Sequence, residues 1–259
     1  MKPHMVILAA GEGRRLRPMT ADRPKVLVDV AGKSLLDWQL EAASRRGIES
    51  VALVTGFMAN QRWTDGCRRY HNPRYAETNM VATLWCAEPE FHGEMIVSYG
   101  DILYEDSVLQ SIIDSDAPVS VVVDLDWRVY WQQRFTDPLT DAESLRLQPD
   151  GRIVEIGQRA ASIEEIQGQY IGLTKFRDCG IDAMRETYEA ASKHGPGHSN
   201  GKPAEQMYMT DLLQAMIDAG HEVRAVPIRR GWLEVDSVAD YELANLHTKP
   251  SPRGAQISI

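Results

Sequence analysis

The sequence predicts an α/β fold, a Rossmann-like three-layer sandwich built on a mostly parallel mixed sheet. Short apolar runs alternate with amphipathic segments, which is typical of strands connected by helices that cover the sheet. With 259 residues, 43% of them hydrophobic, the chain has enough apolar material for one large core. The predicted strands are residues 6–10, 51–55, 95–99, 119–125 and 224–228.

Helical spacing of apolar residues predicts the segments between these strands. Leu36, Leu40 and Ala43 recur at helical intervals after the first strand, and residues 108–113 carry a similar pattern. These two helices are expected to cover faces of the sheet. A further helix is predicted over 204–219, with its methionines facing the core, because a proline precedes it and a glycine follows it.

One domain is expected over residues 1–247. Two stretches interrupt the alternation of strands and helices: 127–147, rich in aromatic and charged residues, and 194–203, a loop of small and polar residues. Long excursions of this kind often form lids over a ligand, so both are predicted to be lid-like. Residues 248–259 are predicted to form a disordered tail.

Charge and cysteine content restrict the partners and the compartment. The formal net charge of -9 argues against nucleic acid and against an acidic membrane surface, because a basic field attracts such polyanions. Cys67, Cys86 and Cys179 lack the spacing of a zinc site or a disulfide framework, which suits a reducing compartment. No apolar run approaches membrane length. A cytoplasmic protein is expected, and a homodimer is one possible assembly.

The strongest local signal is a glycine-rich loop directly after the first strand. Gly11 and Gly13 permit backbone conformations and close approaches that a Cβ would block, so the loop amides can face phosphate oxygens. Arg15 and Lys25 supply positive charge. The loop lacks the Gly-Lys-Ser/Thr ending of a P-loop, and Leu16 stands where a dinucleotide-binding loop has its third glycine. The pattern therefore predicts another kind of triphosphate cradle, the alternative being a solvated loop.

Residues 8–25, LAAGEGRRLRPMTADRPK, fit L-A-A-G-x-G-x-R-L-x-P-x-T-x-x-x-P-K at every fixed position. This is the signature of the sugar-phosphate nucleotidyltransferase superfamily, which the chain resembles. The resemblance implies the nucleotide-diphospho-sugar transferase type of fold, with Arg15 holding the β and γ phosphates and Lys25 bridging the acceptor's anion and the α-phosphate. The nucleotide-binding residues that it implies around the loop are Leu8, Ala9, Ala10, Gly11, Gly13, Arg15 and Gly100.

Two carboxylates that follow strand-like segments are the predicted metal ligands. Asp101 ends the apolar strand at 95–99, which places it at the carboxyl edge of the sheet, beside the loop. Asp236 follows a strand-like segment that starts near Trp232. Two such carboxylates can hold Mg²⁺ together with waters and substrate phosphates, and the resemblance implies this role for both. The alternative is that they are turn or helix caps.

A later segment resembles a narrower group within the superfamily. Residues 79–84, NMVATL, are similar to the N-x-x-x-S/T-L segment of the small choline-phosphate and phosphonate cytidylyltransferases. This resemblance places Asn79 and Thr83 in the nucleotide pocket. Their spacing puts both on one helical face, where an amide and a hydroxyl can bond a pyrimidine edge. CTP is therefore the favoured nucleotide, whereas the alternative for Asn79 is an N-cap.

The acceptor is predicted to lie against the 127–147 excursion. Trp127, Trp131 and Tyr170 belong to segments that resemble the same cytidylyltransferases, and with Lys25 they are the predicted acceptor-binding residues. Aromatic and acidic side chains can enclose an ammonium group, as phosphocholine, aminoethylphosphonate or an amino-acid phosphate would require. The alternative is that the two tryptophans form only the apolar face of a short helix.

Together these observations predict a Mg²⁺-dependent cytidylyltransferase with Lys25, Arg15, Asp101 and Asp236 as catalytic residues. It would couple CMP from CTP to a small phosphate, phosphonate or phosphoramidate and release pyrophosphate. Such an acceptor is already anionic, so no general base is required. The main alternative is a sugar-1-phosphate nucleotidyltransferase that uses UTP or dTTP, although the chain lacks the Glu-Lys-Pro of many such enzymes. A regulatory homologue that binds nucleotide without turnover is a third possibility.

Overall fold

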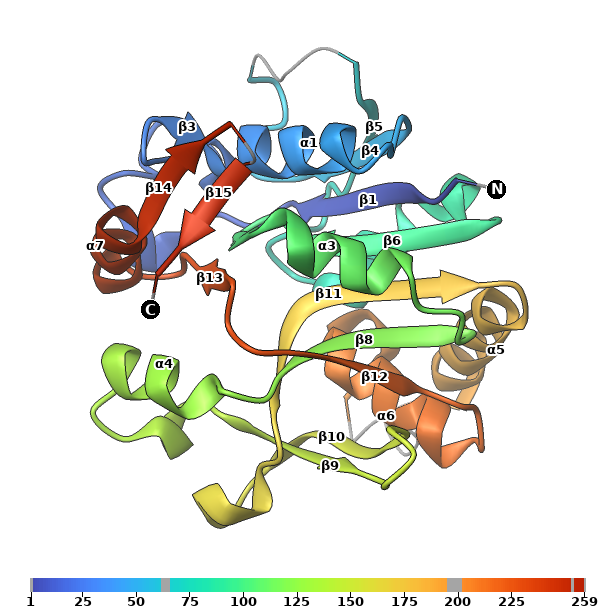
Figure 1. Cartoon of the computed structure of the whole chain (residues 1–259). Coiled ribbons are helices and arrows are strands. Elements are labelled where there is room, and N and C mark those ends of the chain that lie inside the picture. Colours follow the sequence, from blue (N-terminus) through green and yellow to red (C-terminus); the bar gives the residue numbers. More distant parts are fainter. Residues whose placement is uncertain (1, 62–65, 195–201, 253, 259) are drawn as a thin grey trace.

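The computed structural model describes residues 2–61, 66–194, 202–252 and 254–258. Its centre is a seven-stranded sheet in the order β12-β8-β11-β6-β1-β4-β5 (Figure 1). Neighbouring strands are parallel except that β11 is antiparallel to both β6 and β8, so the predicted mostly parallel mixed sheet is confirmed. The strands of this sheet are β1 (His4–Ala9), β4 (Val51–Thr55), β5 (Arg68–His71), β6 (Glu94–Tyr99), β8 (Val119–Asp124), β11 (Gln169–Arg177) and β12 (Arg224–Ile228).

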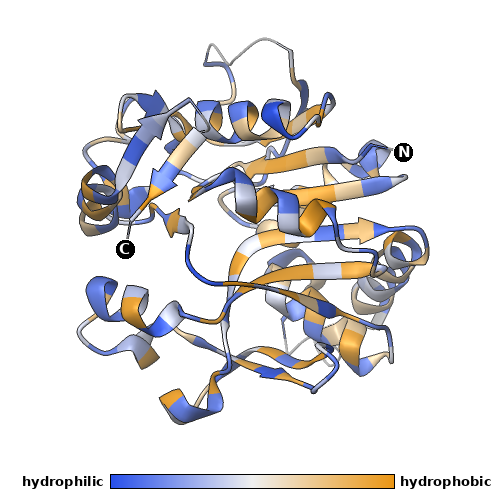
Figure 2. Ribbon diagram, viewed as in Figure 1, coloured by the Kyte–Doolittle hydropathy of each residue, from blue (hydrophilic) through white to orange (hydrophobic). Residues whose placement is uncertain are grey.

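Alternation along the buried strands separates the core into two layers. In β1, Met5 and Ile7 pack into one hydrophobic cluster, and Val6 and Leu8 pack into the other, because successive side chains of a strand point to opposite faces. A central strand covered on both faces must be apolar at every position, which explains the continuous run in β1. Figure 2 shows the hydrophobic residues gathered on the central strands. The predicted three-layer arrangement follows from these two clusters.

Helices cover both faces of the sheet (Figure 1). The helices predicted over 36–43 and 108–113 are confirmed, whereas the one predicted over 204–219 starts later. It begins at Met209 because the Asp211 carboxylate accepts a hydrogen bond from the Tyr208 amide at 2.8 Å, which satisfies a free donor at the helix start. The helices are α1 (Leu35–Arg45), α2 (Met80–Trp85), α3 (Asp106–Ile113), α4 (Trp127–Arg134), α5 (Cys179–His194), α6 (Met209–Asp218) and α7 (Val238–His247).

The 127–147 excursion contains regular structure. It comprises α4, a 3₁₀ turn (Pro138–Thr140) and β9 (Glu143–Leu147), which pairs with β10 (Ile153–Arg159) in an antiparallel ribbon. Tyr130 of α4 is fully buried. The other predicted lid, 194–203, falls largely on 195–201, outside the described residues.

The C-terminal segment differs from the disordered tail predicted for 248–259. Strands β14 (Thr248–Ser251) and β15 (Gly254–Ile257) form an antiparallel hairpin beside α1 (Figure 1). Its polar composition suggested disorder, but a few long-range contacts order it. Ala255 is buried in the core, and the amide of Ile257 donates to the Glu105 carboxylate at 2.8 Å.

A small sheet beside the carboxyl edge of the main sheet brings two distant segments together. Strand β7 (Ile102–Tyr104) follows the turn after β6, and it pairs antiparallel with β13 (Trp232–Glu234). The amide of Val235 donates to the carbonyl of Asp101 at 2.9 Å. The remaining hairpin, β2 (Asp29–Val30) with β3 (Lys33–Ser34), precedes α1. Within the described residues, none of the helices combines the length and apolar character needed to cross a membrane.

Asp124 fixes the end of β8 against the start of β13. Its carboxylate is fully buried and accepts hydrogen bonds from the Trp232 indole at 2.9 Å and the Arg230 guanidinium at 3.1 Å. Asp124→Ala is expected to lower the free energy of unfolding by about 3–5 kcal/mol, because it leaves the largely buried guanidinium without its counter-charge.

The matched control is Asp116→Ala, which breaks an Asp–Arg pair of the same 3.1 Å length at a carboxylate whose side chain is 98% exposed. Exposed ion pairs contribute little, so this variant should lose far less stability. Urea unfolding of both variants measures the difference. If both variants lose the same free energy of unfolding, the buried Asp124 pair does not stabilise the contact between β8 and β13.

Candidate active site

The glycine-rich loop leaves β1 at the carboxyl edge of the sheet. Gly13 has φ +63°, and a Cβ there would lie 3.0 Å from the Lys25 side chain. Gly13 is therefore required by backbone conformation and by its close approach to Lys25. At Gly11 an added Cβ would meet nothing within 4 Å, because this residue faces open space. Gly11 is thus free to let a ligand approach the backbone.

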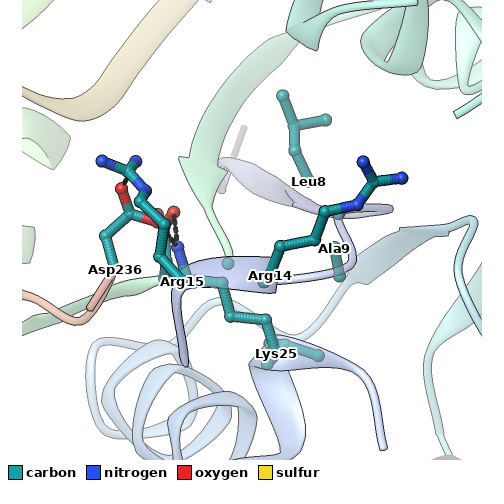
Figure 3. A pocket seen from close by; sticks show the side chains of 11 residues that line it. Leu8, Ala9, Arg14, Arg15, Lys25 and Asp236 are labelled. Carbon is teal, nitrogen blue, oxygen red and sulfur yellow. Dashed lines mark hydrogen bonds and ion pairs between the residues drawn. The ribbon is translucent and has the colours of Figure 1, made fainter. Parts of the chain in front are cut away.

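Lys25 lies at the centre of the site. It belongs to the 3₁₀ turn Lys25–Leu27, and its Nζ donates to Asp101 Oδ2 at 2.7 Å and to Asp236 Oδ1 at 2.6 Å. Arg15 forms a second ion pair with Asp236. Figure 3 shows Arg15 and Asp236 directed toward each other, whereas Arg14 points away from them. The four residues predicted to be catalytic therefore form one cluster.

Three cavities adjoin this cluster. The loop cavity, of 260 Å³, is lined by the glycine-rich loop, Lys25, Asp101 and Asp236. The helix cavity, of 230 Å³, lies beside the start of α2, and the aromatic cavity, also of 230 Å³, lies between α4, β11 and β13. Asp101 lines both the loop and helix cavities, and Asp236 lines both the loop and aromatic cavities. The two carboxylates thus stand where the three cavities meet.

The sequence-predicted nucleotide residues divide between two of these cavities. Leu8 and Gly11 line both the loop and helix cavities, and so does Gly100. A Cβ at Gly100 would lie 2.8 Å from the carbonyl of Leu8, so glycine is required there for the close approach of the two segments. Ala9 and Gly13 line the loop cavity, and Ala10 lines the helix cavity.

Asn79 and Thr83 both line the helix cavity. Asn79 stands at the N-cap position of α2, but its side chain does not cap the helix and instead donates to the Gln206 carbonyl at 3.2 Å. Thr83 is buried and hydrogen-bonded to Asn72 Nδ2 at 3.0 Å. Thr78 also lines this cavity, and sequence reasoning missed it. The amide oxygen of Asn79 therefore has more freedom to meet a ligand than the Thr83 hydroxyl.

Only one of the two predicted tryptophans lines the aromatic cavity. Trp131 lines it, although only 4% of its surface is exposed, and its indole donates to Asp141 Oδ2 at 3.0 Å. Trp127 is 1% exposed and packs edge-to-face on Trp131, within the hydrophobic core. The helical-face alternative therefore describes Trp127, whereas Trp131 belongs to both core and cavity. Tyr170 lines the cavity as predicted.

Carboxylates line the same cavity, and sequence reasoning assigned no role to three of them: Asp141, Glu143 and Glu234. Burial raises the pKa of Glu143 to about 7, with the negative charge of Asp211 adding to the shift. Burial also raises the pKa of Glu234, and the Arg134 guanidinium, 2.7 Å from its carboxylate, opposes that shift. The sequence did carry a signal for Asp141 and Glu143, which belong to the aromatic and acidic 127–147 excursion, whereas Glu234 lies outside that excursion.

Fold and site together define an α/β protein whose glycine-rich loop lies beside two carboxylates at the carboxyl edge of a mostly parallel sheet. The chain belongs to the MobA-like NTP transferase domain family, whose profile matches residues 5–154. This membership confirms the resemblance to nucleotidyltransferases that the loop signature indicated.

One known relative extends the similarity over most of the chain. The chain is 36% identical over 250 residues to CTP:phosphoglutamine cytidylyltransferase of Campylobacter jejuni, covering 92% of this chain and 97% of that one. It is 33% identical over 104 residues to choline-phosphate cytidylyltransferase of Streptococcus pneumoniae, covering 39% and 45%. A solved structure of CTP:phosphocholine cytidylyltransferase from Streptococcus pneumoniae superposes with a TM-score of 0.74 at 21% identity, over 95% of this chain and 99% of that one. This likeness confirms the fold.

The pKa of Glu143 predicts how stability depends on pH. A carboxyl whose folded pKa is about 7, above its ordinary 4.5, binds its proton more tightly in the folded protein. Its contribution to stability therefore falls as pH rises from about 4.5 to about 7. Glu143→Gln removes this titration, so its melting temperature relative to wild type should rise between pH 5 and pH 8. Differential scanning calorimetry across that range measures the difference, and a constant or falling difference would contradict the assignment.

Proposed function

We propose that this protein is a CTP-dependent nucleotidyltransferase that couples CMP to a small phosphate-type acceptor and releases pyrophosphate. The observation that carries the proposal is the meeting of three cavities at Lys25, Asp101 and Asp236. A reaction between a nucleoside triphosphate and a second substrate requires separate space for phosphates, base and acceptor around one reacting centre. The names of the relatives support CTP and a phosphate-type acceptor.

Each cavity suits one part of the reactants. The loop cavity offers backbone amides and the positive charges of Arg15 and Lys25, which suit a triphosphate. The helix cavity, with Asn79 and Thr78, offers the polar groups that a pyrimidine edge requires. The aromatic cavity then receives the acceptor. Because Asp236 borders it, an acceptor placed there has its phosphate next to the Lys25 cluster.

The reaction needs alignment more than acid–base chemistry. An oxygen of the acceptor's phosphate attacks the α-phosphorus of CTP, and the bond from that phosphorus to the bridging oxygen breaks as pyrophosphate leaves. The acceptor oxygen is already anionic, so no proton has to be removed. Lys25 can neutralise charge between the acceptor and the α-phosphate, and Arg15 can hold the outer phosphates. Both side chains line the loop cavity, so both can reach it.

The residues present fit a magnesium ion. Asp101 and Asp236 approach a common point, since both accept hydrogen bonds from the same Lys25 nitrogen. Asp101 Oδ1 is buried, and no described group donates a hydrogen bond to it. Mg²⁺ is commonly held by one or two carboxylates together with substrate phosphates. We therefore propose Asp101 and Asp236 as its ligands, and when bound it would stabilise the charge that develops on the phosphates.

The aromatic cavity favours an acceptor with a positively charged distal group. Trp131 and Tyr170 present ring surfaces, and Asp141, Glu143 and Glu234 present carboxylates. A hexose has no charge to meet these carboxylates, whereas an ammonium group would pair with them and with the rings. Phosphocholine, 2-aminoethylphosphonate and amino-acid phosphates carry such a group. The sugar-1-phosphate nucleotidyltransferase remains the alternative.

Substrate choice tests the function directly. Pyrophosphate release should be highest with CTP, compared with UTP, ATP and GTP, when phosphocholine, 2-aminoethylphosphonate or phosphoglutamine is the acceptor. A site that bonds one polar base edge rejects other bases, because its buried polar groups would be left unpaired. Hexose 1-phosphates serve as the control acceptors. Faster release with UTP or dTTP and a hexose 1-phosphate would replace this proposal by the sugar alternative.

The metal ligands are tested by titration. Asp101→Asn and Asp236→Asn should each raise the Mg²⁺ concentration needed for half-maximal activity and lower the rate, because a neutral amide is a poorer ligand for a hard dication. Asp116→Asn, at an exposed site distant in the fold, is the matched control. Unchanged Mg²⁺ titrations in both site variants would remove these carboxylates from the metal site.

A further inference from the structure

Lys25 occupies the place at which a dication would have to bind. Its Nζ bridges the two proposed ligands, at 2.7 Å from Asp101 and 2.6 Å from Asp236, and only 11% of its side chain is exposed. A metal ion held by both carboxylates would lie between them, in the space that the ammonium group occupies. The ammonium group and a dication therefore exclude each other at this point.

The charges of the cluster also disfavour the binding of a dication in the ligand-free protein. Asp101 and Asp236 carry two negative charges, and Lys25 and Arg15 carry two positive charges. In this arrangement the four groups are electrically neutral together, so they offer a dication little attraction. If both cations move to the phosphates of a bound nucleotide, the carboxylates are left with two uncompensated charges. Close pairs of this kind interact strongly when partly buried, so the change in affinity for a dication should be large.

The side chains allow such a movement. A Cβ at Gly13 would lie 3.0 Å from the Cβ of Lys25 and 3.1 Å from its Cγ, so glycine at this position leaves room for the base of the Lys25 side chain. Lys25 lines the loop cavity, and the flexible four-carbon stem of a lysine gives its ammonium group more than one position. Arg15 is 66% exposed and meets little steric hindrance. The distal end of Lys25 can therefore turn from the carboxylates to the phosphates without a change in the backbone.

We propose that Lys25 is the resident countercation of the metal site and that it couples metal binding to nucleotide binding. In the ligand-free protein it holds Asp101 and Asp236 together and keeps dications out. When phosphates draw its ammonium group away, the two carboxylates become available to the metal. This inference rests on the proposed function, because it takes the two carboxylates as metal ligands. It predicts that a variant lacking this catalytic lysine binds metal more tightly than the wild type.

The test measures the binding of Mn²⁺ alone, by isothermal titration calorimetry, in protein without nucleotide. Lys25→Met removes the charge and keeps much of the side-chain volume, so it should bind Mn²⁺ about 5- to 150-fold more tightly than wild type, the usual range of coupling between two sites. Lys25→Arg keeps the charge and should bind Mn²⁺ as weakly as wild type. Asp101→Asn added to Lys25→Met should abolish the gain.

Melting temperatures measured with and without Mn²⁺ show whether each variant is folded and whether it binds the metal. Lys25→Met removes the counter-charge of Asp101 and leaves Asp236 paired with Arg15 alone, so its melting temperature should fall without metal and recover with Mn²⁺ by more than that of wild type. If Lys25→Met does not fold, Lys25→Gln replaces it, because it keeps hydrogen-bond donors without the charge. Folded variants that bind Mn²⁺ no more tightly than wild type, or whose melting temperature gains no more from it, would overturn the proposal.

The experiment distinguishes a failure of this inference from a failure of the proposed reaction. Pyrophosphate release by wild type with CTP is measured on the same preparation. Normal turnover without tighter Mn²⁺ binding in the variants overturns only the coupling. Tighter Mn²⁺ binding without turnover of CTP leaves the coupling supported and counts against the proposed function.

Discussion

The pairing of Lys25 with Asp101 and Asp236 is the interaction on which the rest of the site depends. It joins residues that are 76 and 211 positions apart in the chain. Two features of the fold make it possible. Strands β1 and β6 are parallel neighbours, so the loop after one and the turn after the other meet at the same edge of the sheet. The β7–β13 pair then brings Asp236 to that edge.

A second buried ionic network supports this pairing. The amide of Asp236 donates to the Asp240 carboxylate at 3.3 Å, and the Arg134 guanidinium binds that carboxylate at 2.8 Å. The same guanidinium pairs with Glu234 at 2.7 Å and lies 5.4 Å from the ring centre of Trp131. One buried cation thus contacts the wall of the aromatic cavity and the support of a proposed metal ligand. The wall of the aromatic cavity and the position of Asp236 therefore depend on the same cation.

Local patterns in the sequence predicted five strands of the main sheet, but they missed β5 and β11 and did not show which strands pair. Continuous apolar runs identify buried strands, and the five predicted strands were confirmed. Helical spacing, however, is the same for Trp127 and Trp131, and only the packing of α4 decides which one reaches the cavity. The C-terminal hairpin was missed because contacts such as that between Ile257 and Glu105 link residues 152 apart. Glu143 was missed because its raised pKa arises from burial, which sequence does not show.

The distribution of charge around the site gives the acceptor a direction. In the proposed reaction its phosphate approaches Lys25 and the α-phosphate, whereas its distal group meets the cavity that Asp141, Glu143 and Glu234 line. An anion placed the other way round would meet these carboxylates. The pKa of Glu143, raised to about 7 by burial and by Asp211, indicates that an unpaired negative charge is already unfavourable there. A cationic distal group would relieve this cost by favouring the ionised form of Glu143. In the proposed reaction, specificity for the acceptor and orientation of its phosphate would therefore have the same electrostatic origin.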